Sequence, residues 1–274
     1  MTLAIVAHQR EPTNAMLAAR LGAELLSPRV ALASLAPGDV ALARIDVLPT
    51  LDGVEPGLEL LEALEGRGVQ LLNRADPLLG VHDKWRTAVL LRSAGVPHPW
   101  TEHVRTVPEL LELEPPLVVK PRFGSWGHDV VRCRDRDELN AWAARLQRRP
   151  WFMRTGALVQ ELLPPPGHDL RLLVARGRVF GGAERVARRG EWRTNVSLGA
   201  VRRHAEPSEE ACELAVRAVA AVGIDVAGVD LLPVAGSYVP LELNGAADFD
   251  ESYSLERDVF EALRDALDVE PAPV

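Results

Sequence analysis

The sequence predicts a mixed α/β fold in which a small N-terminal domain with a parallel sheet precedes two units dominated by strands. Its 274 residues, 47% of them hydrophobic, are enough for one large or two ordinary domains with a buried core. Up to Asn73, short apolar runs alternate with amphipathic stretches, which is typical of a parallel α/β unit. From residue 116 onward, most apolar runs have the length and composition of strands.

The N-terminal domain is expected over residues 1–75. Its strands are predicted at 3–7, 43–48 and 69–73, where the apolar runs are short. One helix is capped by Thr13 or Asn14 and ends at Gly22, and a second runs from Pro56 to Gly66.

The rest of the chain is divided at residue 150 into a central unit, 76–150, and a C-terminal unit, 151–274. A helix that follows Asp83 stops at Gly95, because the VPHP segment after it cannot continue a helix. Further helices are predicted at 135–146, 208–222 and 255–267. Strands are predicted at 116–120, 128–133, 157–163, 169–176, 178–186, 227–234 and 238–244.

The charge and the cysteine content exclude several classes of protein. The formal net charge of −8 argues against a DNA-binding protein held by phosphate contacts. No apolar run approaches the roughly 20 residues that span a bilayer, and the N-terminus has no signal-peptide apolar region. Two cysteines, Cys133 and Cys212, are too few for a disulfide framework or a cysteine-rich zinc site. We therefore expect a cytoplasmic protein with no nucleic-acid and no membrane partner.

Only two of the 31 basic residues are lysines, Lys84 and Lys120. Lysine differs from arginine where a site needs a compact point charge, so a chain rich in arginine is expected to keep lysine at such a site; chance is the alternative. Lys120 is followed by PRFGSWG, in which Gly124, Ser125 and Gly127 let the backbone approach phosphate oxygens. The loop thus predicts phosphate binding, with a plain hairpin turn as the alternative. Lys120 itself is expected to be solvent-accessible before a nucleotide binds.

The last two strands carry three oxygen donors, Asp230, Glu242 and Asn244. Side chains alternate along a strand, so Glu242 and Asn244 share a face, and a short turn at 235–237 brings the strand of Asp230 alongside. Two carboxylates and an amide are suited to Mg²⁺. Acids within apolar strands need a partner, which favours a metal site over a solvated polar face.

Other polar residues are weaker signals when taken singly. Glu161 ends a predicted strand and is a candidate for holding the adenine or ribose of a nucleotide. Asp169 and Arg171 lie two apart, on one strand face, and Arg193 and Asn195 form a similar pair in GEWRTN. A surface pair is the alternative for Arg193 and Asn195.

In combination, these motifs resemble those of the ATP-grasp ligases of the RimK type. They stand in the order of that family, from about Asn73 to Asn244: Asp83-Lys84, VVKP with GSWG, QELL, HDLR, EWRTN, GVDLLP and LELNG. Both lysines fall on the nucleotide-binding lysine positions of the family. The resemblance implies a pre-ATP-grasp domain over 1–75 and a two-subdomain ATP-grasp fold over 76–150 and 151–274.

The resemblance also implies a role for each site residue, with ATP and Mg²⁺ bound and Mn²⁺ as an alternative metal. The residues implied to bind ATP are Lys84, Lys120, Ser125, Trp126, Gly127, Glu161, Leu162, Leu163 and Asp169. The catalytic residues would be Arg171, Arg193 and Asn195, facing the γ-phosphate and the acyl phosphate. The metal ligands would be Asp230, Glu242 and Asn244.

The activity implied is that of an ATP-dependent carboxylate–amine ligase, which forms an amide through an acyl phosphate and releases ADP and phosphate. Its partners would be a small-molecule or peptide carboxylate and an amine such as glutamate or another amino acid, and the family implies a homo-oligomer. An ATP-grasp kinase and a nucleotide-binding protein without turnover are the alternatives.

The chain departs from its relatives after Asn244, where GAADFDESYS stands in place of small residues and Pro-Gly. Its acids, Asp248, Asp250 and Glu251, are interpreted either as attracting an amine or as an exposed loop.

Overall fold

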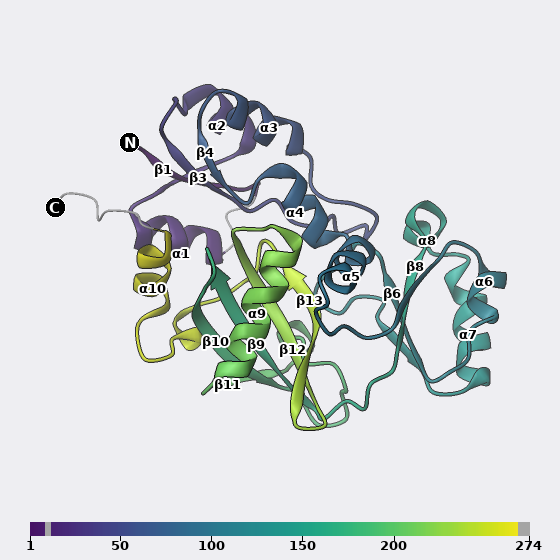
Figure 1. The fold of residues 1–274 in the computed structure, drawn as a ribbon. Helices are drawn as coiled ribbons and strands as arrows, with labels where there is room; N and C mark the ends of the chain where they lie inside the picture. Colours follow the sequence, from purple (N-terminus) through teal and green to yellow (C-terminus); the bar gives the residue numbers. More distant parts are fainter. Residues whose placement is uncertain (9–11, 268–274) are drawn as a thin grey trace.

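The computed structural model describes residues 1–8 and 12–267, which form three β-sheets flanked by helices (Figure 1). The first sheet has the strand order β2-β1-β3-β4, and its strand pairs are parallel. Ile5 packs with Leu17 of the first helix, whereas Ala4 and Val6 belong to the core on the other face, so both faces are covered. The elements are β1 (Leu3–Val6), α1 (Pro12–Leu21), β2 (Glu24–Leu26), α2 (Pro28–Ser34), β3 (Val40–Ala43), α3 (Leu58–Gly66), β4 (Gln70–Leu72) and α4 (Ala75–His82).

The predicted parallel sheet is confirmed, but the strand expected at 43–48 is wrong. That strand is β3, which ends at Ala43, and Ile45 and Val47 are buried loop residues. Arg44 N still donates to Val6 O of β1, but the segment then pairs with the residues that follow it, through Glu55 N to Asp46 O and the bridge between Val47 and Val54. The short β2 and α2 and the helix α4 were not predicted, because their apolar patterns are too brief to show a period.

The second sheet is antiparallel, with the order β5-β8-β6-β7, and has a core of its own that includes Leu117, Val119 and Trp151. In this order β8 lies between β5 and β6, so the middle sheet extends to Glu161, past the boundary expected at residue 150. The elements of this part are α5 (Lys84–Ser93), β5 (Thr101–Val104), α6 (Val107–Leu111), β6 (Leu117–Pro121), β7 (Val131–Cys133), α7 (Arg136–Leu146), α8 (Pro150–Thr155) and β8 (Ala157–Glu161).

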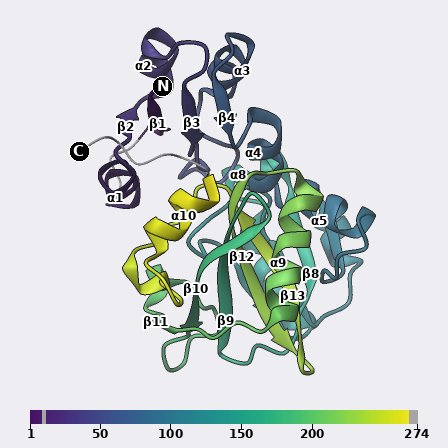
Figure 2. The ribbon, with the colours of Figure 1, turned by 60° about the vertical axis from the view of Figure 1, so that its left-hand side comes forward.

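The third sheet is also antiparallel, with the order β11-β10-β9-β12-β13. Leu170, Leu172 and Val174 of β9 pack in the core that contains α9, whereas Leu173 and Ala175 pack in the core that contains α10. The two helices therefore cover opposite faces of the sheet, as Figure 2 shows. The elements are β9 (His168–Ala175), β10 (Arg178–Val186), the 3-10 helix η1 (Val196–Leu198), β11 (Val201–His204), α9 (Glu209–Val222), β12 (Val226–Val234), β13 (Ser237–Asn244), the 3-10 helix η2 (Glu251–Tyr253) and α10 (Val259–Leu267).

The strand β10 has the bounds predicted for it, and α9, β12 and β13 differ from the prediction by one residue. The last helix begins at Val259 rather than at residue 255. The reason is its cap, because Asp258 Oδ1 accepts from the backbone N–H groups of Phe260 and Glu261.

The first and third sheets share their hydrophobic cores, and Asn73 joins them with hydrogen bonds. Its Nδ2 donates to Val226 O (2.9 Å) and to Gly245 O (3.1 Å), and its Oδ1 accepts from Val226 N. The middle sheet, by contrast, packs around a separate core. A cavity between the middle and third sheets therefore lies between two separately packed bodies, which is where ligand sites are common.

Among the residues described, no helix combines the length and the apolar composition needed to cross a lipid bilayer.

Candidate functional site

A cavity of about 140 Å³ lies between the middle and third sheets. Strands β6 and β8 contribute Lys120 and Glu161, and β9, β12 and β13 contribute Asp169, Asp230 and Glu242. Most of the residues singled out from the sequence line it: Lys84, Lys120, Ser125, Gly127, Glu161, Leu162, Leu163, Asp169, Arg193, Asn195, Asp230 and Glu242. The other three, Trp126, Arg171 and Asn244, line a second cavity of about 100 Å³.

The second cavity adjoins the first. Ser125, Arg185, Asn195 and Glu242 line both, so the two cavities meet at these residues. We call the first cavity the nucleotide cavity and the second the distal cavity.

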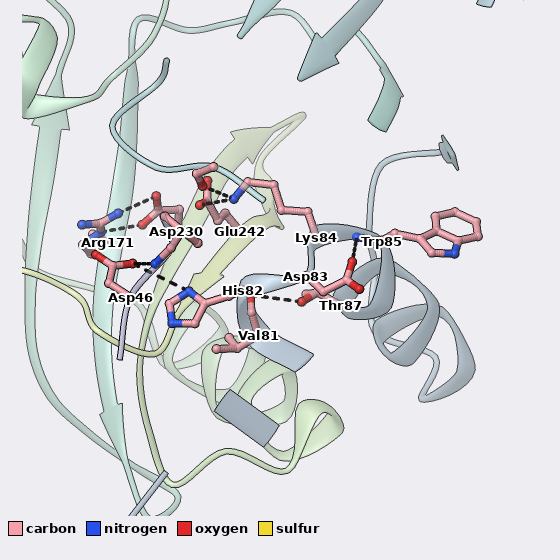
Figure 3. A network of polar contacts seen from close by, with 12 residues as sticks. Asp46, Val81, His82, Asp83, Lys84, Trp85, Thr87, Arg171, Asp230 and Glu242 are labelled. Carbon is pink, nitrogen blue, oxygen red and sulfur yellow. Dashed lines mark hydrogen bonds and ion pairs between the residues drawn. The ribbon is translucent and has the colours of Figure 1, made fainter. Parts of the chain in front are cut away.

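Lys84 is the first residue of α5, whose start is fixed by Asp83. The Asp83 side chain accepts from Trp85 N and Arg86 N, as an N-cap does, and Arg122 donates to the same carboxylate. Lys84 Nζ donates to Gly124 O and lies 2.8 Å from Glu242 Oε1 (Figure 3). Lys84 thus connects the glycine-rich loop to β13.

Lys120 is buried, which contradicts the expectation that it is solvent-accessible. It lies on β6 between β7 and β8, and 7% of its surface is exposed. Burial lowers the pKa of Lys120 to about 8, although the negative charge of Glu242 opposes the shift. The cation that Lys120 presents to the nucleotide cavity therefore loses its proton at a lower pH than an exposed lysine does.

The glycine-rich loop is held against the segment that contains Arg193 and Asn195. Gly127 has φ +75°, and a Cβ there would come within 2.6 Å of Asn195 Oδ1, so the position requires glycine. Ser197 Oγ donates to Trp126 O, and Arg193 Nη1 donates to Gly127 O (2.9 Å). The Trp126 side chain is largely exposed at 44%.

The guanidinium of Arg193, which was predicted to be catalytic, binds protein groups in the structure. It donates to the carbonyls of Gly127 and Val130 and to both carboxylate oxygens of Glu191. The hydrogen bond from Arg193 lowers the pKa of Glu191 to about 2. These contacts connect Arg193 to the glycine-rich loop.

Glu161 lies at the end of β8, where its carboxylate accepts from Trp100 N (2.7 Å). The next residue, Leu162, donates its backbone N–H to Pro116 O. Glu161, Leu162 and Leu163 line the nucleotide cavity and not the distal one. They therefore lie outside the part of the nucleotide cavity that adjoins the distal cavity.

A row of four alternating charges runs across strands β9, β10 and β12. Arg171 binds Asp230 through two hydrogen bonds of 2.6 and 2.8 Å, Arg185 bridges Asp230 and Asp169, and Asp169 also accepts from Thr194. Burial opposes the ionisation of Asp230, but the two guanidiniums outweigh it and hold the pKa of Asp230 well below its usual range. Burial raises the pKa of Asp169, against the influence of Arg185.

Arg185 was missed by the sequence analysis. Its side chain is only 3% exposed and lines both cavities. The signal that could have found it is an arginine close to the apolar run 179–183 of β10, since a buried arginine requires acidic partners.

The proposed metal ligands lie on neighbouring strands. Asp230 of β12 stands opposite Glu242 of β13, and Asn244 stands opposite Gly228. Two carboxylates and an amide are donors that a hard cation accepts, so their chemistry fits Mg²⁺. In the described part of the chain no group of three or more His, Cys, Asp or Glu side chains is arranged for a metal.

Both carboxylates already have cationic partners in the protein. Asp230 is bound by Arg171 and Arg185, and Glu242 is paired with Lys84, as Figure 3 shows for the first and last of these contacts. Phosphate oxygens would compete with these carboxylates for the same cations, so a metal and a phosphate are expected to bind together.

The acidic segment after Asn244 is not a uniform exposed loop. Asp248 lines the distal cavity, Asp250 pairs with Arg202 of β11, and Glu251 is exposed.

His82 is fully buried, and its Nε2 lies 2.8 Å from Ile45 O. Burial lowers the pKa of His82 to about 4, so this ring is neutral at pH 7.

A cavity between two sheets, lined by two lysines, a glycine-rich loop and acids on adjacent strands, defines a protein of the ATP-grasp class. The family model for the RimK-like ATP-grasp domain matches residues 81–263 of this sequence, and the chain belongs to this family. The predicted fold and the predicted family are thereby confirmed.

The relatives of this chain include two archaeal enzymes. It is 29% identical to the tetrahydromethanopterin:alpha-L-glutamate ligase of Methanosarcina acetivorans, over 71% of this chain and 65% of that protein. It is 31% identical to the coenzyme gamma-F420-2:alpha-L-glutamate ligase of Methanocaldococcus jannaschii, over 69% of this chain and 64% of that protein. The match thus spans just under two thirds of the length of either relative.

The fold as a whole is similar to that of a RimK-domain ATP-grasp protein from Sphaerobacter thermophilus. The TM-score is 0.70 at 20% identity, covering 97% of this chain and 99% of that one. This similarity extends over the N-terminal sheet as well as the part matched by the family.

Proposed function

We propose that this protein is an ATP-dependent carboxylate–amine ligase that joins glutamate or another amino acid to a small-molecule or peptide carboxylate. The observation that carries the proposal is the common location of both lysines, Asp230 and Glu242 in one cavity with the glycine-rich loop. Family membership supports ATP as the nucleotide and Mg²⁺ as the metal, and the names of the two archaeal relatives support glutamate.

In the proposed reaction, a substrate carboxylate attacks the γ-phosphorus of ATP to give an acyl phosphate and ADP. An amine then attacks the acyl carbon, loses a proton and displaces phosphate, so that an amide forms. Lys84, Lys120 and Arg171 neutralise charge on the phosphate oxygens during both steps. Asp230, Glu242 and Asn244 would hold Mg²⁺, which supplies further neutralisation of phosphate charge when bound.

The remaining site residues orient the substrates. Arg193 and Asn195 would face the γ-phosphate and the acyl phosphate, and Arg193 also binds the glycine-rich loop. Glu161, Leu162, Leu163 and Asp169 would fix the nucleotide. We further propose that the chain works as three units, an N-terminal domain over 1–75, a central subdomain that ends near Glu161 and a C-terminal subdomain, with a homo-oligomer as the assembled form.

The experiment that tests the proposal is a screen for phosphate release with ATP and Mg²⁺, across paired libraries of carboxylates and amino acids. We expect at least one pair to release ADP and phosphate in equal amounts together with an amide product. Phosphorylated product without amide would show a kinase instead. ATP binding without turnover on any pair would favour a nucleotide-binding protein, and AMP with pyrophosphate would reject the acyl-phosphate route.

A further inference from the structure

The distal cavity has the location expected for a second substrate. It shares Ser125, Arg185, Asn195 and Glu242 with the nucleotide cavity, and Glu161 does not line it. Glu242, one of the shared residues, is proposed to hold Mg²⁺ at the reacting phosphate, so a molecule in the distal cavity would lie beside the reacting carbon.

Arginine side chains in this protein repeatedly bind aspartates through one edge. Arg122, Arg171 and Arg185 each use Nε and Nη2 together, toward Asp83, Asp230 and Asp169 respectively. This edge of the guanidinium matches the two oxygens of a carboxylate.

Arg202 lines the distal cavity, and its contact with an aspartate is made through Nη1 rather than through this edge. Its Nη1 donates to Asp250 Oδ2 (2.5 Å), and its guanidinium carbon lies 5.2 Å from the centre of the Tyr253 ring. Its Nε is buried and finds no hydrogen-bond partner among residues 1–8 and 12–267. The side chain as a whole is 24% exposed, so Arg202 presents another part of its surface to the cavity.

The contacts of Arg202 hold its guanidinium in one orientation. Asp250 itself is fixed, because its Oδ1 accepts from the backbone N–H and the hydroxyl of Ser252. The Tyr253 ring is buried beneath the guanidinium, with 1% of the residue exposed. The guanidinium is therefore held in place before any ligand binds, which lowers the entropic cost of binding.

The other charged groups of the distal cavity do not replace Arg202. Arg171 and Arg185 are paired with Asp230 and Asp169, and the proposed reaction assigns Arg171 to the phosphate. Asp46 and Asp248 also line the cavity, and their negative charge would repel an anion. A carboxylate in this cavity therefore depends on Arg202.

We propose that Arg202 is a specificity-determining residue that binds a carboxylate of the substrate held in the distal cavity, a carboxylate other than the one that is phosphorylated. The inference rests on the proposed function, because that function places the second substrate there. The carboxylate belongs either to the amino-acid acceptor or to a second acid group on the phosphorylated substrate.

The first test measures binding, so it does not depend on turnover. L-glutamate, L-aspartate and citrate are titrated by calorimetry into the protein loaded with ADP and Mg²⁺. We expect at least one to bind, with the affinity reduced about 10- to 100-fold in Arg202→Met and partly retained in Arg202→Lys. Arg203→Met is the matched control, since Arg203 is the next residue of β11 and is exposed.

Equal affinities in Arg202→Met and Arg203→Met would overturn the proposal, as would the absence of binding by all three acids to the wild-type protein. An unchanged affinity for ADP in each variant checks that the nucleotide cavity remains folded.

The second test determines which substrate carries the carboxylate. It also separates the role of Arg202 from the proposed function. For a substrate pair found in the phosphate-release screen, a raised KM for the amine in Arg202→Met assigns the carboxylate to the acceptor. A raised KM for the phosphorylated substrate assigns it there. Turnover with both KM values unchanged overturns the role of Arg202 while the proposed function stands. A wild-type protein without turnover rejects the function, and the binding measurement still decides the role of Arg202.

Discussion

Lys84 Nζ lies 2.8 Å from Glu242 Oε1, and this contact joins a cation proposed to bind phosphate to a carboxylate proposed to bind metal. The contact links the start of α5 to β13 across 158 residues of sequence. Both side chains line the nucleotide cavity, so a phosphate and a metal would each take one member of the pair. In the proposed reaction, the ion pair between Lys84 and Glu242 is therefore replaced by contacts with phosphate and metal.

Glu242→Gln tests the carboxylate side of this exchange. The change removes a negative charge while nearly keeping the shape of the side chain, so we expect turnover to fall by about 100-fold or more. The concentration of Mg²⁺ needed for half-maximal ADP binding should rise, which calorimetry measures without turnover. Glu213→Gln, on the exposed side of α9, is the control. Wild-type kinetics and an unchanged Mg²⁺ requirement in Glu242→Gln would show that β13 does not hold the metal.

Lys120→Arg tests whether the site needs lysine itself. Lys120 is buried, so the larger guanidinium must displace its neighbours, and we expect a loss of about 1 to 3 kcal/mol in stability. The displaced charge should also reduce the rate on the order of 100-fold. Urea unfolding and steady-state kinetics in ATP measure the two effects. Lys120→Met, which keeps the length of the side chain without its charge, should also be slow. A normal rate in Lys120→Arg would show that the site does not require lysine.

The depressed pKa of Lys120 predicts a pH dependence of ATP binding. The free protein loses the lysine proton near pH 8, whereas phosphate charge favours the protonated form and raises this pKa in the complex. ATP binding should therefore take up a proton around pH 8, and affinity should fall as pH rises above that value. Calorimetry in buffers of different ionisation enthalpy measures the uptake. Proton uptake that persists unchanged in Lys120→Met would assign it to another group.

Arg185→Met tests the row of buried charges. It leaves Asp169 and part of Asp230 without their cation, and breaking a buried pair in this way costs about 3 to 5 kcal/mol of unfolding free energy. Arg178→Met, at the exposed start of the same strand, should cost about 0.5 kcal/mol or less. Chemical unfolding at pH 7 compares the two variants, and equal losses would contradict the structural role given to Arg185.

Much of the candidate site could be predicted because its signals are local in the sequence. Glu242 and Asn244 are two residues apart on one strand, and a short turn joins that strand to Asp230, so alternation alone brought these three together. The two lysines were conspicuous by their rarity, and the glycine-rich loop by its composition. The order of these motifs was then enough to indicate the family.

Relationships between distant strands were decided by the tertiary structure. Arg185 meets Asp169 and Asp230 only because β10, β9 and β12 pair in a particular register, and no pattern within β10 specifies that register. The burial of Lys120 depends on β7 and β8 enclosing β6, and the guanidinium of Arg193 is turned toward carbonyls of a loop more than 60 residues away. Local periodicity and composition determine strands, helices and the residue types of a site, because they act over a few residues. Which charges neutralise one another, and which arginine lines the distal cavity beside Asp248, depends on contacts that exist only once the sheets have assembled.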